Sequence, residues 1–161
     1  MFGLTTLGII HTAISLVAVA TGAIALIRDK KIEYSNSVGK IYVIATIATC
    51  LTAFGIYRHG GFGEGHVLGI ITLVVLGVAL LAGKDSKPFG KLSPYIKTVA
   101  YSMTFFFHLV PGITETATRL PVDAPLASGP KDPHIQMVLG ICFLLFLIGA
   151  TLQVRKLRKG I

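Results

Sequence analysis

The chain has 161 residues, of which 53% are hydrophobic and 14% are charged, and its mean hydropathy is +0.76. Such a composition is too apolar for a soluble domain of this size and indicates a protein that resides in a bilayer. The two cysteines, Cys50 and Cys142, lie inside apolar runs, so neither a disulfide framework nor a thiolate zinc site is indicated.

Five apolar stretches follow one another, each near the ~20 residues that a helix needs to cross the hydrocarbon layer. They predict an all-α fold: one integral membrane bundle of five transmembrane helices over residues 1–161. The stretches are Leu4 to Ile27, Ile41 to Tyr57, His66 to Gly83, Tyr95 to Pro111 and Ile135 to Val154. The fourth stretch carries Lys97, whose side chain is expected to snorkel to the membrane interface. The first stretch is expected to be retained, because the start MFGLTT lacks the positive region of a signal peptide.

The basic residues predict the orientation of the bundle. If the five helices alternate, 12 of the 15 lysines and arginines fall on one side, and only Arg58, Arg119 and Lys131 fall on the other. The positive-inside rule then places the N-terminus outside and the C-terminus in the cytoplasm, as for a multi-pass protein of the bacterial inner membrane. The net charge of +8 is therefore a topology signal, and no nucleic-acid partner is expected. The expected partner is the lipid bilayer, with a homo-oligomer or a membrane complex left open.

All five histidines fall on the predicted outer side: His11, His59, His66, His108 and His134. Two of the helices carry their histidine in a stripe of small or polar residues with helical spacing. On the first helix the stripe is Gly8, His11, Ser15 and Gly22, and on the fourth it is Tyr101, Thr104 and His108. Because an unpartnered imidazole is costly in hydrocarbon, both stripes are expected to point into the bundle, with His11 and His108 facing each other or a ligand.

The two outer connections add further donors. The glycines of RHGGFGEGH, residues 58–66, allow a tight return that would bring His59, Glu64 and His66 together. In PGITETATRLPVDAPLASGPKDPH, residues 111–134, Pro111 is expected to stop or kink the fourth helix, so that Glu115 could fold back over His108. A connection of that length without its own structure is typical of a functional or mobile loop.

These residues predict an outer-face site for a transition metal, zinc, copper or iron, or for a haem, and with it a role in redox or metallocofactor handling. His11, His66 and His108 would be the ligands, with Glu115 or Glu64 as a fourth ligand, Arg119 as a charge partner, and His59 and His134 as further donors. A single haem b would use His11 and His108. Two stacked haems are not expected, since no helix carries a second histidine near its inner end.

Two alternatives remain open from the same residues. The first is a zinc-dependent hydrolase in which Glu115 is the general base and a lipid-like substrate enters from the outer leaflet. The second is a non-catalytic membrane subunit or conduit in which the histidines only satisfy one another.

Three segments carry a resemblance: VGKIYVIATIATCLTAFGIYRHGGFGEGHVLGIITL, residues 38–73, HTAISLVAVATGAIAL, residues 11–26, and FHLVPGITE, residues 107–115. The chain resembles small predicted bacterial membrane proteins of unknown function, which have four to six helices, a G-K/R-x-Y opening the second helix and a histidine in the third. In some of them a histidine precedes this element, whereas residues 35–38 of this chain are SNSV. Some similar proteins are linked to assembly of respiratory oxidases, so the resemblance implies histidine-bearing membrane helices and metal or haem handling.

Overall fold

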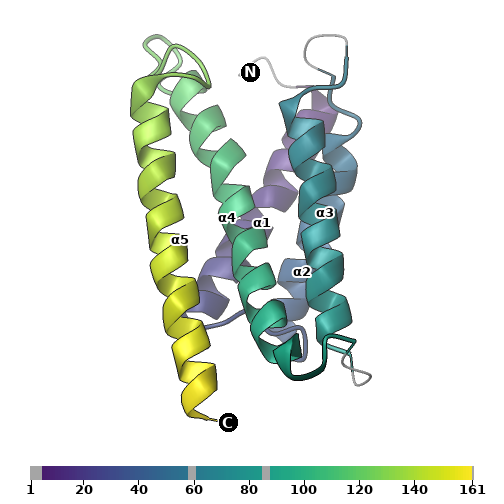
Figure 1. Ribbon diagram of the computed structural model, residues 1–161. Helices are drawn as coiled ribbons and strands as arrows, with labels where there is room; N and C mark the ends of the chain where they lie inside the picture. The colour runs from purple at the N-terminus through teal and green to yellow at the C-terminus, as the bar shows by residue number, and fades with distance from the viewer. Residues whose placement is uncertain (1–4, 58–60, 85–87, 161) are drawn as a thin grey trace.

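The computed structural model describes residues 5–57, 61–84 and 88–160, and this part of the chain is all-helical without a strand (Figure 1). The all-α class is therefore confirmed. The elements are α1 (Thr6–Arg28), α2 (Ser37–Ala53), α3 (Glu64–Ala82), the short 3-10 helix η1 (Gly90–Leu92), α4 (Ser93–Arg119) and α5 (Pro133–Lys159). Because the five long helices alternate in direction, the two termini lie at opposite ends of the bundle (Figure 1).

Three of these helices, α1, α3 and α5, are long and apolar enough to cross a membrane, while α2 is a shorter apolar helix. Side-chain caps fix where three helices begin. Thr5 accepts a hydrogen bond from the Gly8 amide, Asn36 from the Gly39 amide and Asp132 from the His134 amide. Each cap satisfies a backbone donor that the first helical turn leaves unpaired.

The expectation that the fourth helix stops at Pro111 is wrong, since α4 continues to Arg119. An internal proline removes one backbone donor and crowds the carbonyl four residues before it, yet α4 continues through this position. Beyond it, the Thr116 hydroxyl donates to the Gly112 carbonyl, and Glu115 pairs with Arg119 one turn later. The loop between the fourth and fifth helices is correspondingly shorter than predicted and spans residues 120–132.

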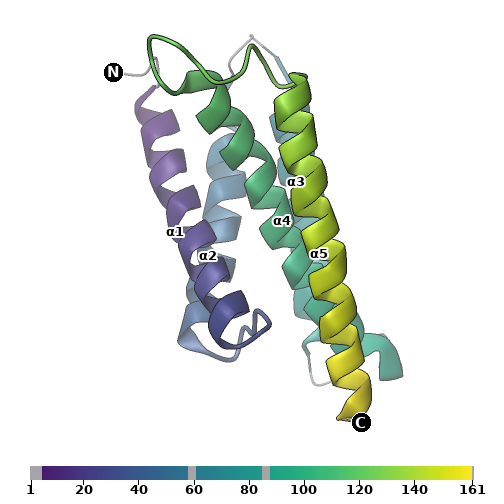
Figure 2. The ribbon, with the colours of Figure 1, turned by 90° about the vertical axis from the view of Figure 1, so that its left-hand side faces the viewer.

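The helices pack as a sequence of neighbours, α1 on α2, α3 on α4 and α4 on α5, with α1 also touching α4. A buried cluster joins the first four of them and includes Tyr42, Leu76 and Tyr101. Helix α5 packs against no described helix other than α4. Figure 2 shows α1 and α5 on opposite sides of α4. Most of its apolar side chains are exposed on the protein surface, as lipid-facing side chains would be.

Lys97, near the start of α4, lies against Glu33 in the α1–α2 connection, with Nζ 2.6 Å from the carboxylate. Lys31 contacts the other carboxylate oxygen at 2.8 Å. The lysine that was expected only to snorkel therefore also ties the base of α4 to the α1–α2 turn.

Acidification is expected to weaken the ion pairs that Glu33 forms with Lys31 and Lys97. Burial alone would raise the pKa of Glu33, but hydrogen bonds and charges from Lys31 and Lys97 outweigh it and lower the pKa below its ordinary 4.5. The stabilisation is thus fully present above pH 4.5 and is lost as the pH falls through the lowered pKa. We expect Glu33→Gln to cost about 1 kcal/mol of unfolding free energy at pH 7.

The measurement is detergent unfolding of both proteins from pH 7 to pH 3. The difference in unfolding free energy between wild type and Glu33→Gln should disappear as the pH approaches 3. A gap that does not depend on pH would show that the carboxylate charge contributes nothing.

Candidate functional site

The polar residues of α2 lie on one face of an otherwise apolar helix. Tyr42, Thr46, Thr49 and Thr52 are spaced four, three and three residues apart, which places them in a stripe along one side. This stripe receives the histidine of α1 and the histidine of α4. We refer to these four residues with His11 and His108 as the two-histidine site.

His108 is buried, with 6% of its surface exposed, and its Nε2 lies 3.0 Å from the Thr46 hydroxyl. Its ring stands edge-on to Tyr42, with the ring centroids 6.1 Å apart. The Tyr42 hydroxyl in turn lies 2.7 Å from the hydroxyl of Thr104, one turn before His108 on α4. The prediction that Tyr101, Thr104 and His108 point into the bundle is confirmed, because all three are buried.

His11 is half-buried on α1, and its Nδ1 lies 2.9 Å from the Thr52 hydroxyl. One turn further, the Ser15 hydroxyl lies 3.4 Å from that of Thr49. The α1 stripe thus points into the bundle, as predicted, and there it packs on the polar face of α2.

The hydrogen bonds of Thr52 indicate the tautomer of His11. The Thr52 hydroxyl donates to the Ala48 and Thr49 carbonyls, at 2.8 and 3.0 Å, so its oxygen is left to accept from His11 Nδ1–H. A neutral imidazole protonated at Nδ1 carries its lone pair on Nε2. The Nε2 atom of His11 is therefore the nitrogen that can coordinate an ion.

His108 ends a chain of hydroxyl groups on α2 and α4. Thr104 donates to the Tyr101 carbonyl at 2.8 Å, so its oxygen accepts from the Tyr42 hydroxyl. The bond between Thr46 and His108 Nε2 can run in either direction. If Nε2–H is the donor, the lone pair of the imidazole lies on Nδ1.

His66 lies apart from this pair in an aromatic enclosure. Its Nδ1 accepts a hydrogen bond from the Gly63 amide at 3.1 Å and so caps α3. Its ring stacks on Phe54 and Phe62 and is tilted against Tyr57, at centroid distances of 5.0 to 6.4 Å. Its Nε2 is buried and has no hydrogen-bond partner among the residues that the structure describes.

The remaining predicted donors are dispersed. Glu64 is exposed in the first turn of α3, where it lines a small hollow with residues 128–133. His134 is 82% exposed in its side chain and contacts Asp132 at 3.1 Å. His59 lies outside the described residues.

The idea that Glu115 folds back over His108 is wrong, because the two residues lie two turns apart on the continuous helix α4. That spacing corresponds to about 10 Å along the helix axis. The Glu115 carboxylate contacts Arg119 Nε at 2.6 Å, so both charges belong to one ion pair on α4. The role of Arg119 as charge partner of a metal or haem site stays a prediction.

The structure thus joins His11 and His108 to the same face of α2, through threonines about 9 Å apart along the helix axis, and gives His66 separate neighbours. Within residues 5–57, 61–84 and 88–160, no three histidine, cysteine or acidic side chains gather in a way that could hold a metal ion. The sequence interpretation overlooked Tyr42, Thr46 and Thr52, whose hydroxyl groups meet the polar side chains of α1 and α4. Their spacing on one side of an apolar helix was the signal that could have identified them.

The fold and the site define a helical protein with three helices able to span a membrane and with buried histidines held by hydroxyl groups. No family model, curated protein or solved structure matches the chain.

Proposed function

We propose that this is an integral membrane protein in which His11 and His108 together bind one transition metal ion. In this proposal all five helices span the bacterial inner membrane, with the N-terminus outside and the C-terminus in the cytoplasm. The lysines and arginines at the C-terminal ends of α1 and α5 and in the connections after α1 and α3 support this orientation. The two imidazoles lie toward the opposite, outer end of the bundle.

One observation carries the proposal: the imidazoles of α1 and α4 are each hydrogen-bonded through one ring nitrogen to a threonine of α2. Metal-binding histidines characteristically use one nitrogen for the ion and donate the other N–H to a neighbouring acceptor, which fixes the ring. Imidazole is a good ligand for zinc, copper, nickel and iron. Water or a partner molecule would complete the coordination.

A bare ion is favoured over haem b on grounds of space. Both histidine-bearing helices are already joined to α2 by side-chain hydrogen bonds of 2.9 to 3.0 Å. A macrocycle inserted between the rings would have to separate these helices, whereas an ion would not. An absorbance spectrum distinguishes the two, since only haem gives a Soret band.

The test uses the full chain purified in mild detergent and loaded separately with Zn²⁺, Cu⁺ and haemin. Wild type is expected to retain one ion per chain. His11→Gln and His108→Gln should each bind at least tenfold more weakly, although glutamine can still donate to the threonine and keep the helices together. His134→Gln is the matched control, because this imidazole is exposed and remote from the site.

The opposite result is also informative. If wild type binds neither ion nor haem while His11→Gln and His108→Gln unfold more easily, the histidines serve only to join helices. That outcome would establish the non-catalytic subunit in place of the metal site.

A further inference from the structure

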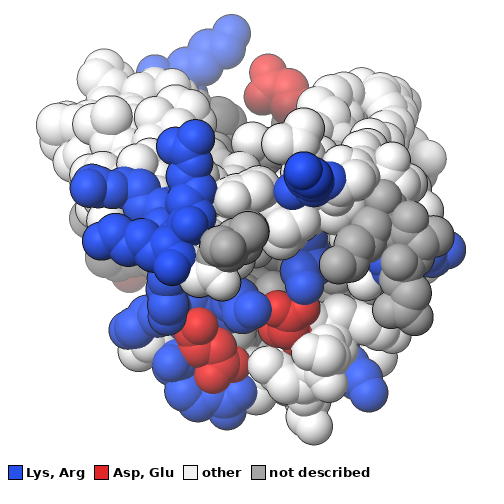
Figure 3. All heavy atoms as spheres, turned by 60° about the horizontal axis from the view of Figure 1, so that its bottom comes forward, with Lys and Arg blue, Asp and Glu red and all other residues white. Residues whose placement is uncertain are grey.

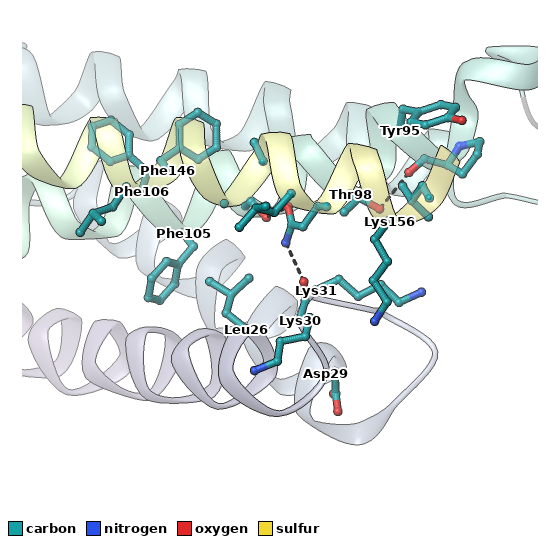
Figure 4. Close-up of a pocket in the computed structure, with 18 of the residues that line it drawn as sticks. Leu26, Asp29, Lys30, Lys31, Tyr95, Thr98, Phe105, Phe106, Phe146 and Lys156 are labelled. Carbon is teal, nitrogen blue, oxygen red and sulfur yellow. Dashed lines mark hydrogen bonds between the residues drawn. The ribbon is translucent and has the colours of Figure 1, made fainter. Parts of the chain in front are cut away.

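A long cleft runs between α1 and α5, over the surface of α4, toward the basic end of the bundle (Figure 4). Its volume is about 1390 Å³, whereas ordinary small-molecule sites occupy roughly 300–1,000 Å³. The cleft exists because α5 packs on α4 without reaching α1. It shares no lining residue with the two-histidine site.

The body of the cleft is apolar. Its walls include Leu26 from α1, Phe105 and Leu109 from α4, and Leu145 and Phe146 from α5. Along α4 the lining extends from Tyr95 to Leu109, which corresponds to about 20 Å of helix. One leaflet contributes about 15 Å of hydrocarbon, half of the membrane core, so the cleft is long enough for the acyl chain of a lipid.

The mouth of the cleft is basic. Lys30, Lys31, Lys91 and Lys156 line it, and Figure 3 shows lysines and arginines gathered on this end of the molecule. Lys31 is paired with Glu33, but neither Lys91 nor Lys156 forms an ion pair within the described part of the chain. Asp29, the acidic residue in the lining, is already bonded to Arg28 at 2.7 and 2.8 Å.

Gln153 fixes the shape of the cleft near its mouth. Its side-chain oxygen accepts a hydrogen bond from Ser102 at 2.9 Å, and its amide donates to the Lys30 carbonyl at 2.8 Å. These bonds tie α5 to α4 and to the turn after α1, as the dashed line to the Lys30 backbone indicates in Figure 4. These bonds thereby fix the position of the lysine-bearing mouth relative to the apolar walls.

We infer that this cleft binds one anionic phospholipid, with the phosphate between Lys91 and Lys156 and an acyl chain along Phe105 and Phe146. Juxtamembrane lysines attract anionic headgroups, and the apolar walls replace lipid contacts for the chain. A second copy of the protein is a poorer occupant, because it would bring the same excess of lysines to this mouth. The described acidic residues nearest to it, Asp29 and Glu33, are already engaged in ion pairs.

The test is native mass spectrometry of the full chain in detergent, titrated with phosphatidylglycerol or with phosphatidylcholine. Wild type is expected to retain one phosphatidylglycerol and to bind phosphatidylcholine at least tenfold more weakly. Lys91→Gln and Lys156→Gln should each weaken binding of phosphatidylglycerol about fivefold. Lys159→Gln, outside the lining, should not change it.

A second pair of variants tests the apolar part independently of charge. Gly149 lines the cleft and Gly140 does not, and a Cβ at either position meets no atom within 4 Å. Gly149→Phe should fill the cleft and raise the dissociation constant at least tenfold, whereas Gly140→Phe should leave it unchanged. Equal binding of both lipids, or a Gly149→Phe variant that disrupts a dimer and leaves lipid binding intact, would overturn the inference.

Discussion

Replacing Gly39 by alanine is expected to lower the free energy of unfolding by about 3 kcal/mol, although alanine is intrinsically the better helix former. A Cβ at this position would overlap the Glu33 carbonyl group, whose carbon would be only 2.6 Å away. The overlapped atoms are backbone, and they cannot move freely. The Glu33 carbonyl accepts from the Asn36 amide, and its side chain is held by Lys97.

The measurement is equilibrium unfolding of the purified protein, for example by titration with SDS and detection of helical circular dichroism. Gly77→Ala is the matched control, because a Cβ at Gly77 in α3 meets nothing within 4 Å. That variant should be unchanged or slightly more stable. If both variants proved equally stable, the close packing of the α1–α2 turn on the start of α2 would be refuted.

Truncating Tyr42 to alanine is expected to cost about 4 kcal/mol, since the residue is fully buried in the cluster that joins four helices. Tyr42→Phe retains the ring and should cost only about 1 kcal/mol, the usual net contribution of one hydrogen bond. The difference between the two variants separates ring packing from the hydroxyl. Both are measured by the same unfolding titration.

Local pattern was enough to predict most of the helices. The apolar runs and the polar stripes of α1 and α4 have helical spacing, and these stripes were correctly placed in the interior. The predicted helix end at Pro111 was wrong because the hydrogen bonds of the rest of α4 outweigh the one that proline removes. The true end of α4 lies at Arg119, after stabilising contacts such as the Glu115–Arg119 pair.

Whether the histidines share one site depends on tertiary contacts, and the spacing of residues in the sequence does not reveal these contacts. Placing His11, His66 and His108 at one end of the bundle was possible from topology. Which of them share a neighbour depends on the order of the helices around the bundle, and that order is set by packing between residues far apart in the chain.

By itself, therefore, the sequence determined an apolar helical chain with its basic residues at one end and its histidines toward the other, because hydropathy, helical period and charge are local properties. Only the tertiary structure decided that α2 holds the imidazoles of α1 and α4, that His66 sits among aromatic rings, and that α5 stands away from α1 to leave a cleft. The physical reason is that a hydrogen bond or a cleft between helices depends on their relative position and rotation, and these are fixed by the packing of the whole bundle.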